Sequence, residues 1–257
     1  LEYYPSISSF HAMKKLKKIK FKGYFAGFGD PKLSQNNKKN ISNIKTDVSK
    51  IFLRGGIADV NKIRQFAELP KTASELKSIS KYFNKNDIYL KDDFTEKSIK
   101  SSKLDKYTVL SFATHGIVAN ELSNINEPGL ITTPPAKGTI DDDGVLKSSE
   151  IKNLKLNAEL VILSACNTAS SDGSSSAEGL SGLTSSFFYA GARSLLVSHW
   201  YVEDESTVEL MKKTFDNLNN NLSLSESLRS SKISMIQNNS TSHPIFWAPF
   251  ILVGGSS

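Results

Sequence analysis

Residues 107–116 read YTVLSFATHG, and residues 159–167 read ELVILSACN. Each stretch contains a short apolar run, at 107–113 and at 159–165, which predicts a buried strand. A reactive side chain follows each run: His115 lies two positions after the first, and Cys166 directly follows the second. Both the expected fold and the candidate chemistry rest on these two strand ends.

The rest of the chain alternates between short apolar segments and amphipathic ones. Strands are expected at residues 24–30, 88–90, 107–113, 159–165 and 194–200 and within 244–253. Helices are expected at residues 73–84, 95–102, 178–190 and 205–218, and after a capping sequence at 223–226. This alternation predicts an α/β fold with a mostly parallel central sheet and helices on both faces.

Two boundaries carry more detailed expectations. Thr72 and Glu75 have the spacing of a capping box, so Thr72 is expected to cap the helix at residues 73–84. Pro249 lies in the last apolar segment and has no N–H to give to a sheet, which favours an edge position for that strand.

The two strand ends suggest a catalytic pair. Parallel sheets carry their sites at the carboxyl ends of strands, and consecutive strands are usually neighbours, so His115 and Cys166 are expected close together. A histidine beside a thiol accepts its proton and leaves a nucleophilic thiolate. Taken singly, the cysteine has an alternative interpretation as an inert buried thiol, and the histidine as a surface or packing residue.

Gly116 is a candidate for the oxyanion hole of the same site. Without a side chain, its backbone N–H can approach a substrate carbonyl and, together with the N–H of Cys166, form an oxyanion hole. The alternative is a turn glycine after a strand.

Composition limits the classes of function. The chain has 257 residues, 39% of them hydrophobic, with a net charge of +6. Its lysines are scattered among Asn and Ser, which indicates a solvated basic surface and disfavours direct nucleic-acid binding. Apolar runs are shorter than the ~20 residues of a membrane helix and no signal-peptide pattern is present, so a cytoplasmic location without membrane contact is expected.

Cys166 is the only cysteine, which excludes an internal disulfide and a multi-cysteine metal site. The acidic run at residues 141–144 lacks the ligand spacing of a calcium loop and is interpreted as a tight Asp-Gly turn. The sequence around Gly27 and Gly29 lacks the other residues of a nucleotide-binding fingerprint, so nucleotide binding is not expected. His199 and His243 are interpreted as structural, and no metal or cofactor is expected.

An ordered series of motifs then resembles one known family. The motifs lie at residues 112–116 (FATHG), 163–169 (LSACNTA), 179–183 (GLSGL), 190–194 (AGARS), 198–200 (SHW) with Asp204, and 243–248 (HPIFWA). Further matches lie at residues 4–6 (YPS), 29–31 (GDP) and 69–72 (LPKT) with Glu75. In this order they resemble the CHAT domain, a family related to caspases and separases.

The resemblance covers nearly the whole chain and implies one domain over residues 1–257. Residues 1–105 would form its N-terminal part and residues 106–257 the part with the dyad. It implies a three-layer α/β/α caspase-like fold, with His115 and Cys166 as the catalytic dyad. Asn167 differs from the Glu of many relatives, and residues 117–150 are unusual for the family, which leaves the substrate open.

The family often accompanies tetratricopeptide repeats, and Leu1 in place of Met favours a fragment of a longer protein. The loop at residues 170–178 is either a plain linker or a segment that orders on activation. The expected function is a cysteine endopeptidase acting on protein substrates, regulated by such a repeat module or another partner. The alternatives are a silent scaffold of the same fold and a thiol acyltransferase.

Specificity is expected from residues 198–204 (SHWYVED), which follow the strand after the nucleophile strand. In caspase-like peptidases this segment lines the pocket for the residue before the cleaved bond. Trp200 and Asp204 would then bind a Lys or Arg side chain. Alternatively, the acids at residues 203–205 simply begin the next helix, where negative charge is favourable.

Overall fold

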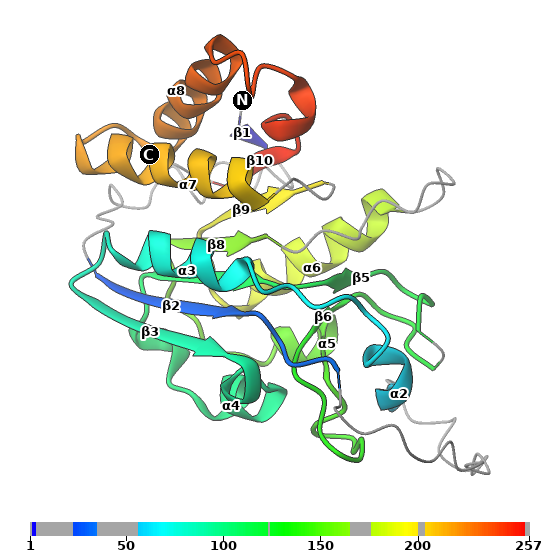
Figure 1. The fold of residues 1–257 in the computed structure, drawn as a ribbon. Helices are drawn as coiled ribbons and strands as arrows, with labels where there is room; N and C mark the ends of the chain where they lie inside the picture. Colours follow the sequence, from blue (N-terminus) through cyan, green and yellow to red (C-terminus); the bar gives the residue numbers. More distant parts are fainter. Residues whose placement is uncertain are drawn as a thin grey trace.

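The computed structural model describes residues 2–3, 23–34, 56–122, 124–164, 176–199 and 204–254, without side-chain detail at 2–3, 176–181 and 204. Within these ranges the main sheet has seven strands in the order β1-β10-β9-β8-β4-β2-β3 (Figure 1). Its strands are β1 (Glu2–Tyr3), β2 (Tyr24–Gly29), β3 (Lys85–Leu90), β4 (Val109–Ala113), β8 (Leu160–Leu163), β9 (Ser194–Ser198) and β10 (Phe250–Gly254).

The five strands from β3 to β9 in this order are mutually parallel, and β10 is antiparallel to β9. The predicted fold class, an α/β/α arrangement around a mostly parallel sheet, is confirmed. β2 and β3 come from the N-terminal part of the chain. β2 pairs with β4 on one side and with β3 on the other, so one continuous sheet joins both parts.

Helices cover both faces of the sheet. In Figure 1, α3 and α7 lie on one side of the strands, and α4 and α5 lie on the other. The helices are α2 (Val60–Ile63), α3 (Thr72–Ser80), α4 (Glu96–Ser101), α5 (Ser148–Ile151), α6 (Ser176–Ala190), α7 (Asp204–Asn219) and α8 (Leu224–Gln237), with short 3₁₀ turns η2 (Lys91–Asp93), η3 (Leu104–Lys106) and η4 (Pro244–Phe246).

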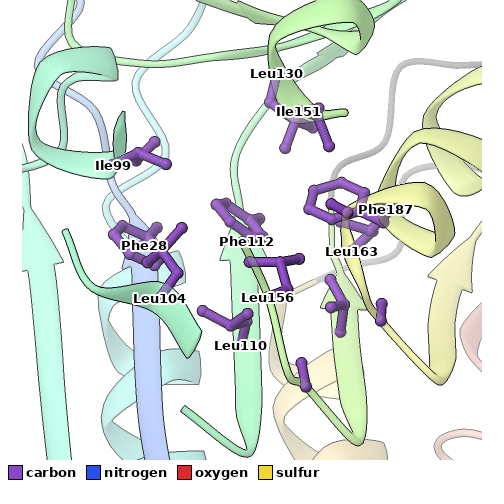
Figure 2. Packing of buried hydrophobic residues seen from close by; sticks show 14 of the residues in the cluster. Phe28, Ile99, Leu104, Leu110, Phe112, Leu130, Ile151, Leu156, Leu163 and Phe187 are labelled. Carbon is purple, nitrogen blue, oxygen red and sulfur yellow. The ribbon is translucent and has the colours of Figure 1, made fainter. Parts of the chain in front are cut away.

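The strands divide their side chains between two cores, as the period of two residues requires. In β4, Leu110 and Phe112 join one core, while Val109 and Ala113 join the other. Figure 2 shows the first core, where Phe112 lies between Phe28 of β2 and Phe187 of α6. The ring of Phe112 stacks on that of Phe28 with 5.0 Å between the ring centroids, and its centroid lies 5.4 Å from that of Phe187. Aromatic packing therefore stabilises the position of β4, the middle one of the five parallel strands.

A second, three-stranded sheet begins directly after His115. Its antiparallel strands are β5 (Gly116–Ile117), β6 (Gly129–Ile131) and β7 (Val145–Lys147). The long β6–β7 connection includes the acidic run 141–144, for which a tight turn was expected. Gly144 has the positive φ of a turn, at 89°. Asp143, however, is fully buried. Its carboxylate accepts a hydrogen bond from Lys147 Nζ at 2.7 Å, so Asp143 anchors the connection.

Two boundary predictions were wrong. Thr72 is the first residue of α3, with Lys71 at the N-cap and no side-chain cap. Thr72 Oγ1 instead accepts a hydrogen bond from the N–H of Asp30 at 2.9 Å and so joins α3 to the end of β2.

The last strand begins only at Phe250, beyond Pro249. β10 pairs with both β1 and β9, so it is not an edge strand. The capping sequence at Ser223 and Glu226 is confirmed.

Glu96 connects the β6–β7 loop to α4. Its side chain is fully buried, and its carboxylate accepts the N–H groups of Asp143 at 2.7 Å and Gly144 at 2.8 Å. Lys100 Nζ lies 2.7 Å from the other carboxylate oxygen and also contacts Glu150. Burial, with the nearby charges of Glu150 and Asp143, raises the pKa of Glu96 from 4.5 to about 7 despite the pairing with Lys100.

This pKa predicts a pH-dependent stability. An acid whose pKa is raised in the folded state holds its proton more tightly there than in the unfolded chain. The free energy of unfolding should therefore fall as pH rises from about 4.5 to about 7, by roughly 1 kcal/mol per pH unit. Urea denaturation across this range measures the slope, and Glu96→Gln should flatten it. Glu209→Gln is the matched control, because Glu209 pairs with Lys213 on α7. An unchanged slope in Glu96→Gln would contradict the assignment.

Candidate functional site

His115 lies just beyond the carboxyl end of β4, as the sequence predicts. Its backbone is held by β6: Ile131 N donates to His115 O at 2.9 Å, and Thr114 Oγ1 donates to Ile131 O at 2.7 Å. The second sheet therefore fixes the direction in which the chain leaves β4.

The imidazole of His115 has two contacts from the segment between α2 and α3. Its Nε2 lies 2.8 Å from the carbonyl oxygen of Ala67, and its ring lies 5.2 Å from the ring of Phe66, tilted by 51°. A carbonyl oxygen only accepts hydrogen bonds, so Nε2 must be the donor and carry a proton. In the neutral ring the lone pair is then on Nδ1, which leaves Nδ1 as the basic nitrogen.

Neither contact is predicted by the sequence. Ala67 acts through its backbone, and any residue type supplies a carbonyl, so no pattern in the sequence identifies it. The segment is held at its start by Arg64, whose Nη2 donates to Pro135 O at 2.8 Å. The prolines of the unusual 117–150 region thus contribute to the support of the candidate base.

Gly116 begins β5 and pairs with Leu130. The hydrogen bond from Ile131 N to His115 O flanks this pair, so Gly116 and Leu130 form the non-hydrogen-bonded kind of antiparallel pair. The N–H of Gly116 is therefore directed away from β6. That orientation suits a donor to a ligand, as the oxyanion-hole prediction requires.

The strand that leads to Cys166 lies directly beside β4. β8 pairs with β4 in parallel register, and the N–H of Ser164 donates to Phe112 O at 2.9 Å. Ser164 is two positions before Cys166. Cys166 itself lies outside the described residues, as do Trp200 and residues 170–175 of the expected loop, whereas residues 176–178 already belong to the first turn of α6. Asp204 is the first residue of α7, although its side chain is not described.

A charged cluster lies at the carboxyl ends of β2 and β3. Lys91 Nζ lies 2.7 Å from Asp30 Oδ1 and 3.3 Å from Glu68 Oε2. Burial alone would raise the pKa of Glu68, but hydrogen bonds from Ser34, Lys91 and Leu33 outweigh it and lower the pKa to about 2. Glu68 therefore remains a carboxylate throughout the physiological range of pH.

The remaining polar groups of the described residues have structural roles or lie apart from one another. Within the described ranges, no group of three or more His, Cys, Asp or Glu side chains is placed to hold a metal ion. His243 Nδ1 accepts the N–H of Ile245 at 3.2 Å and caps η4, which is a structural role. Burial and the charge of Lys232 lower the pKa of His199. Among the same residues, no helix is long and apolar enough to cross a membrane.

Similar proteins were found by sequence and by structure. Tetratricopeptide repeat protein 28 of Mus musculus is 33% identical over 110 residues, which is 43% of this chain and 4% of that protein. The Homo sapiens protein of the same name is 30% identical over 110 residues, with the same coverage. The match thus spans a small part of the length of these relatives.

Among solved structures, the Arg specific cysteine proteinase gingipain R has a TM-score of 0.49 at 9% identity, covering 92% of this chain and 47% of that one. The Saccharomyces cerevisiae separase–securin complex has a TM-score of 0.47 at 14% identity, covering 98% of this chain and 13% of that one. The CHAT domain family model matches residues 1–255. The chain therefore belongs to the CHAT domain family.

Proposed function

We propose that this domain is a cysteine endopeptidase that uses His115 and Cys166 as its dyad. The main support is the tautomer of His115: Nε2 keeps its proton and donates a hydrogen bond to the Ala67 carbonyl, which leaves the lone pair on Nδ1 as the base. The parallel pairing of β4 with β8 adds to this, because both residues follow neighbouring strands at the same edge of the sheet. Membership of the CHAT family agrees with the assignment.

In the proposed reaction, Nδ1 of His115 takes the proton of the Cys166 thiol, and the thiolate sulfur attacks the peptide carbonyl. The N–H groups of Gly116 and Cys166 stabilise the negative charge that develops on the carbonyl oxygen. The C–N bond then breaks, and His115 returns its proton to the leaving amine. Water, deprotonated by His115, hydrolyses the remaining thioester and releases the free thiol. No metal or cofactor takes part in this scheme.

Labelling of the single cysteine tests the dyad without a known substrate. A thiol-directed electrophile at neutral pH should label Cys166 faster than free cysteine, because an adjacent imidazole raises the thiolate fraction. His115→Ala should slow the labelling by about tenfold. His243→Ala is the matched control and should label at the wild-type rate, since His243 only caps η4. Equal labelling rates in wild type and His115→Ala would contradict the assignment of His115 and Cys166 as a catalytic dyad.

Turnover is tested separately by mass spectrometry of the fragments produced from a peptide library, with Cys166→Ala as the control. Rapid labelling without any cleavage would favour the silent scaffold, whereas transfer of the acyl group to an added amine would favour an acyltransferase.

We further propose that Asp204 and Trp200 favour a basic residue before the cleaved bond, with the indole packing along the aliphatic part of the substrate side chain. Asp204 opens α7, which follows β9, and β9 is the neighbour of β8. A carboxylate there would pair with Lys or Arg and would repel an acidic substrate.

Peptides that differ only at this position should be cleaved at least about tenfold faster with Arg or Lys than with Asp or Leu. Asp204→Asn should reduce that preference, and Glu209→Gln, later on the same helix, should not. If Asp204 only stabilises the helix terminus, Asp204→Asn will lower the melting temperature slightly and leave the preference intact.

A regulatory partner is also proposed. The sequence relatives are named for tetratricopeptide repeats, and the matched stretch is only 4% of their length. Such a repeat module would complete the site by ordering a segment near it. Adding the repeat module of the parent protein should raise the cleavage rate of the isolated domain several-fold. An unchanged rate at saturating module would contradict this form of regulation.

A further inference from the structure

The segment between α2 and α3 makes a hydrogen bond and a ring contact with the imidazole of His115. Phe66 packs against the ring and the Ala67 carbonyl accepts a hydrogen bond from Nε2, so two consecutive residues of one irregular turn hold the ring. Ala67 is exposed, and its methyl group gives it little packing to hold its carbonyl in place. The position of this carbonyl must therefore come from neighbouring residues.

Glu68 is the next residue, and its carboxylate is hydrogen-bonded on both oxygens. Oε1 accepts the N–H of Leu33 at 3.0 Å, the N–H of Ser34 at 2.8 Å and the hydroxyl of Ser34 at 2.8 Å. Oε2 accepts Lys91 Nζ at 3.3 Å. One side chain thus joins the turn to the segment after β2 and to the start of η2.

These anchors are themselves fixed to the main sheet. Lys91 follows β3 directly, its N–H donates to Asp30 O at 3.0 Å, and its ammonium pairs with the Asp30 carboxylate. The N–H of Lys32, just before Leu33, donates to Thr133 Oγ1 at 2.9 Å. Glu68 therefore connects the turn to residues that are hydrogen-bonded to the ends of β2 and β3 and to the β6–β7 connection.

We propose that Glu68 is a positioning residue for the candidate base: by holding the turn at residues 66–68, it keeps the Ala67 carbonyl on Nε2 of His115 and so selects the tautomer with Nδ1 as the base. The consequence for catalysis rests on the proposed peptidase function. The consequence for the His115 tautomer does not, because the turn contacts the ring whether or not a substrate is cleaved.

Other residues of the turn have different roles. Arg64 holds the start of the segment, three positions before Ala67, and Phe66 contributes ring packing without a hydrogen bond to the imidazole. An Asp at position 68 would be one methylene shorter and would not span both anchors. Because the Glu68 carboxylate is hydrogen-bonded to two backbone N–H groups as well as to Lys91, both its length and its acceptors matter.

The test uses the whole domain with ¹⁵N-labelled histidine. The chain has four histidines, and the ring signal that disappears in His115→Gln is the signal of His115. Wild type should show neutral His115 mainly as the Nε2–H form. Glu68→Ala, which removes both anchors, should lower the ratio of Nε2–H to Nδ1–H by about tenfold, the value of one hydrogen bond. Glu68→Gln keeps an acceptor for Leu33 and Ser34 and should show a smaller shift.

Asp92→Asn is the matched control. Asp92 lies in η2 beside Lys91 and pairs with Lys32 at 3.0 Å, so its substitution removes the same charge at the same edge without touching the turn. It should leave the ratio of the two His115 tautomers unchanged. If Glu68→Ala fails to fold, as circular dichroism would report, the smaller shift in Glu68→Gln decides the question.

A wild-type tautomer ratio in the folded Glu68 variants would overturn the proposal, as would an equal shift in Asp92→Asn. Kinetics add a second readout once a substrate is known: Glu68→Ala should lower kcat about tenfold or more with little change in KM, because it displaces the base and not the substrate. If the wild type cleaves nothing but the tautomer still shifts in Glu68→Ala, the peptidase assignment fails while the positioning role stands.

Discussion

The central position of β4 governs the rest of this structure. β4 is hydrogen-bonded in parallel to β2 on one side and to β8 on the other, and its Phe112 side chain packs between Phe28 and Phe187. A strand held on both edges and by a buried aromatic stack cannot slide without breaking two ladders. The chain that leaves β4 therefore starts from a fixed position, and His115 lies two residues beyond the end of the strand.

A fixed backbone origin does not by itself orient a side chain. The second sheet holds the backbone of His115 through Ile131, and the turn at residues 66–68 holds its ring. These supports come from segments far apart in sequence, and buried charged groups connect them. Asp143 accepts the N–H of Ala58, shortly before α2, and Glu96 binds the loop that contains Asp143. Buried carboxylates of this kind are costly unless their acceptors are filled, and here backbone N–H groups and lysines fill them.

The sequence predicted what depends on periodicity and failed where a tertiary contact replaces a local one. The runs at 107–113 and 159–165 became β4 and β8 because apolar strands of that length have few alternatives in an α/β protein. Thr72 has the local pattern of a helix cap, yet its hydroxyl bonds to the N–H of Asp30, a strand end 42 positions away. The Ala67 carbonyl and the Glu68 anchors are equally nonlocal, and they involve backbone atoms that every sequence carries.

Two residues of the charged cluster at the carboxyl ends of β2 and β3 have an unusual backbone conformation. Asp30 and Lys91 have φ values of 47° and 51°, in a region that Gly and Asn occupy at lower cost than a long side chain does. The other non-glycine residues with positive φ in the described ranges are Asn120, Asn124 and Asn221. A glycine in place of Lys91 would relieve the strain, but it would remove the ammonium that bridges Asp30 and Glu68. The strained backbone at Lys91 therefore places a positive charge beside the turn that orients His115. A glycine would not be strained there, but it could not form the ion pairs with Asp30 and Glu68.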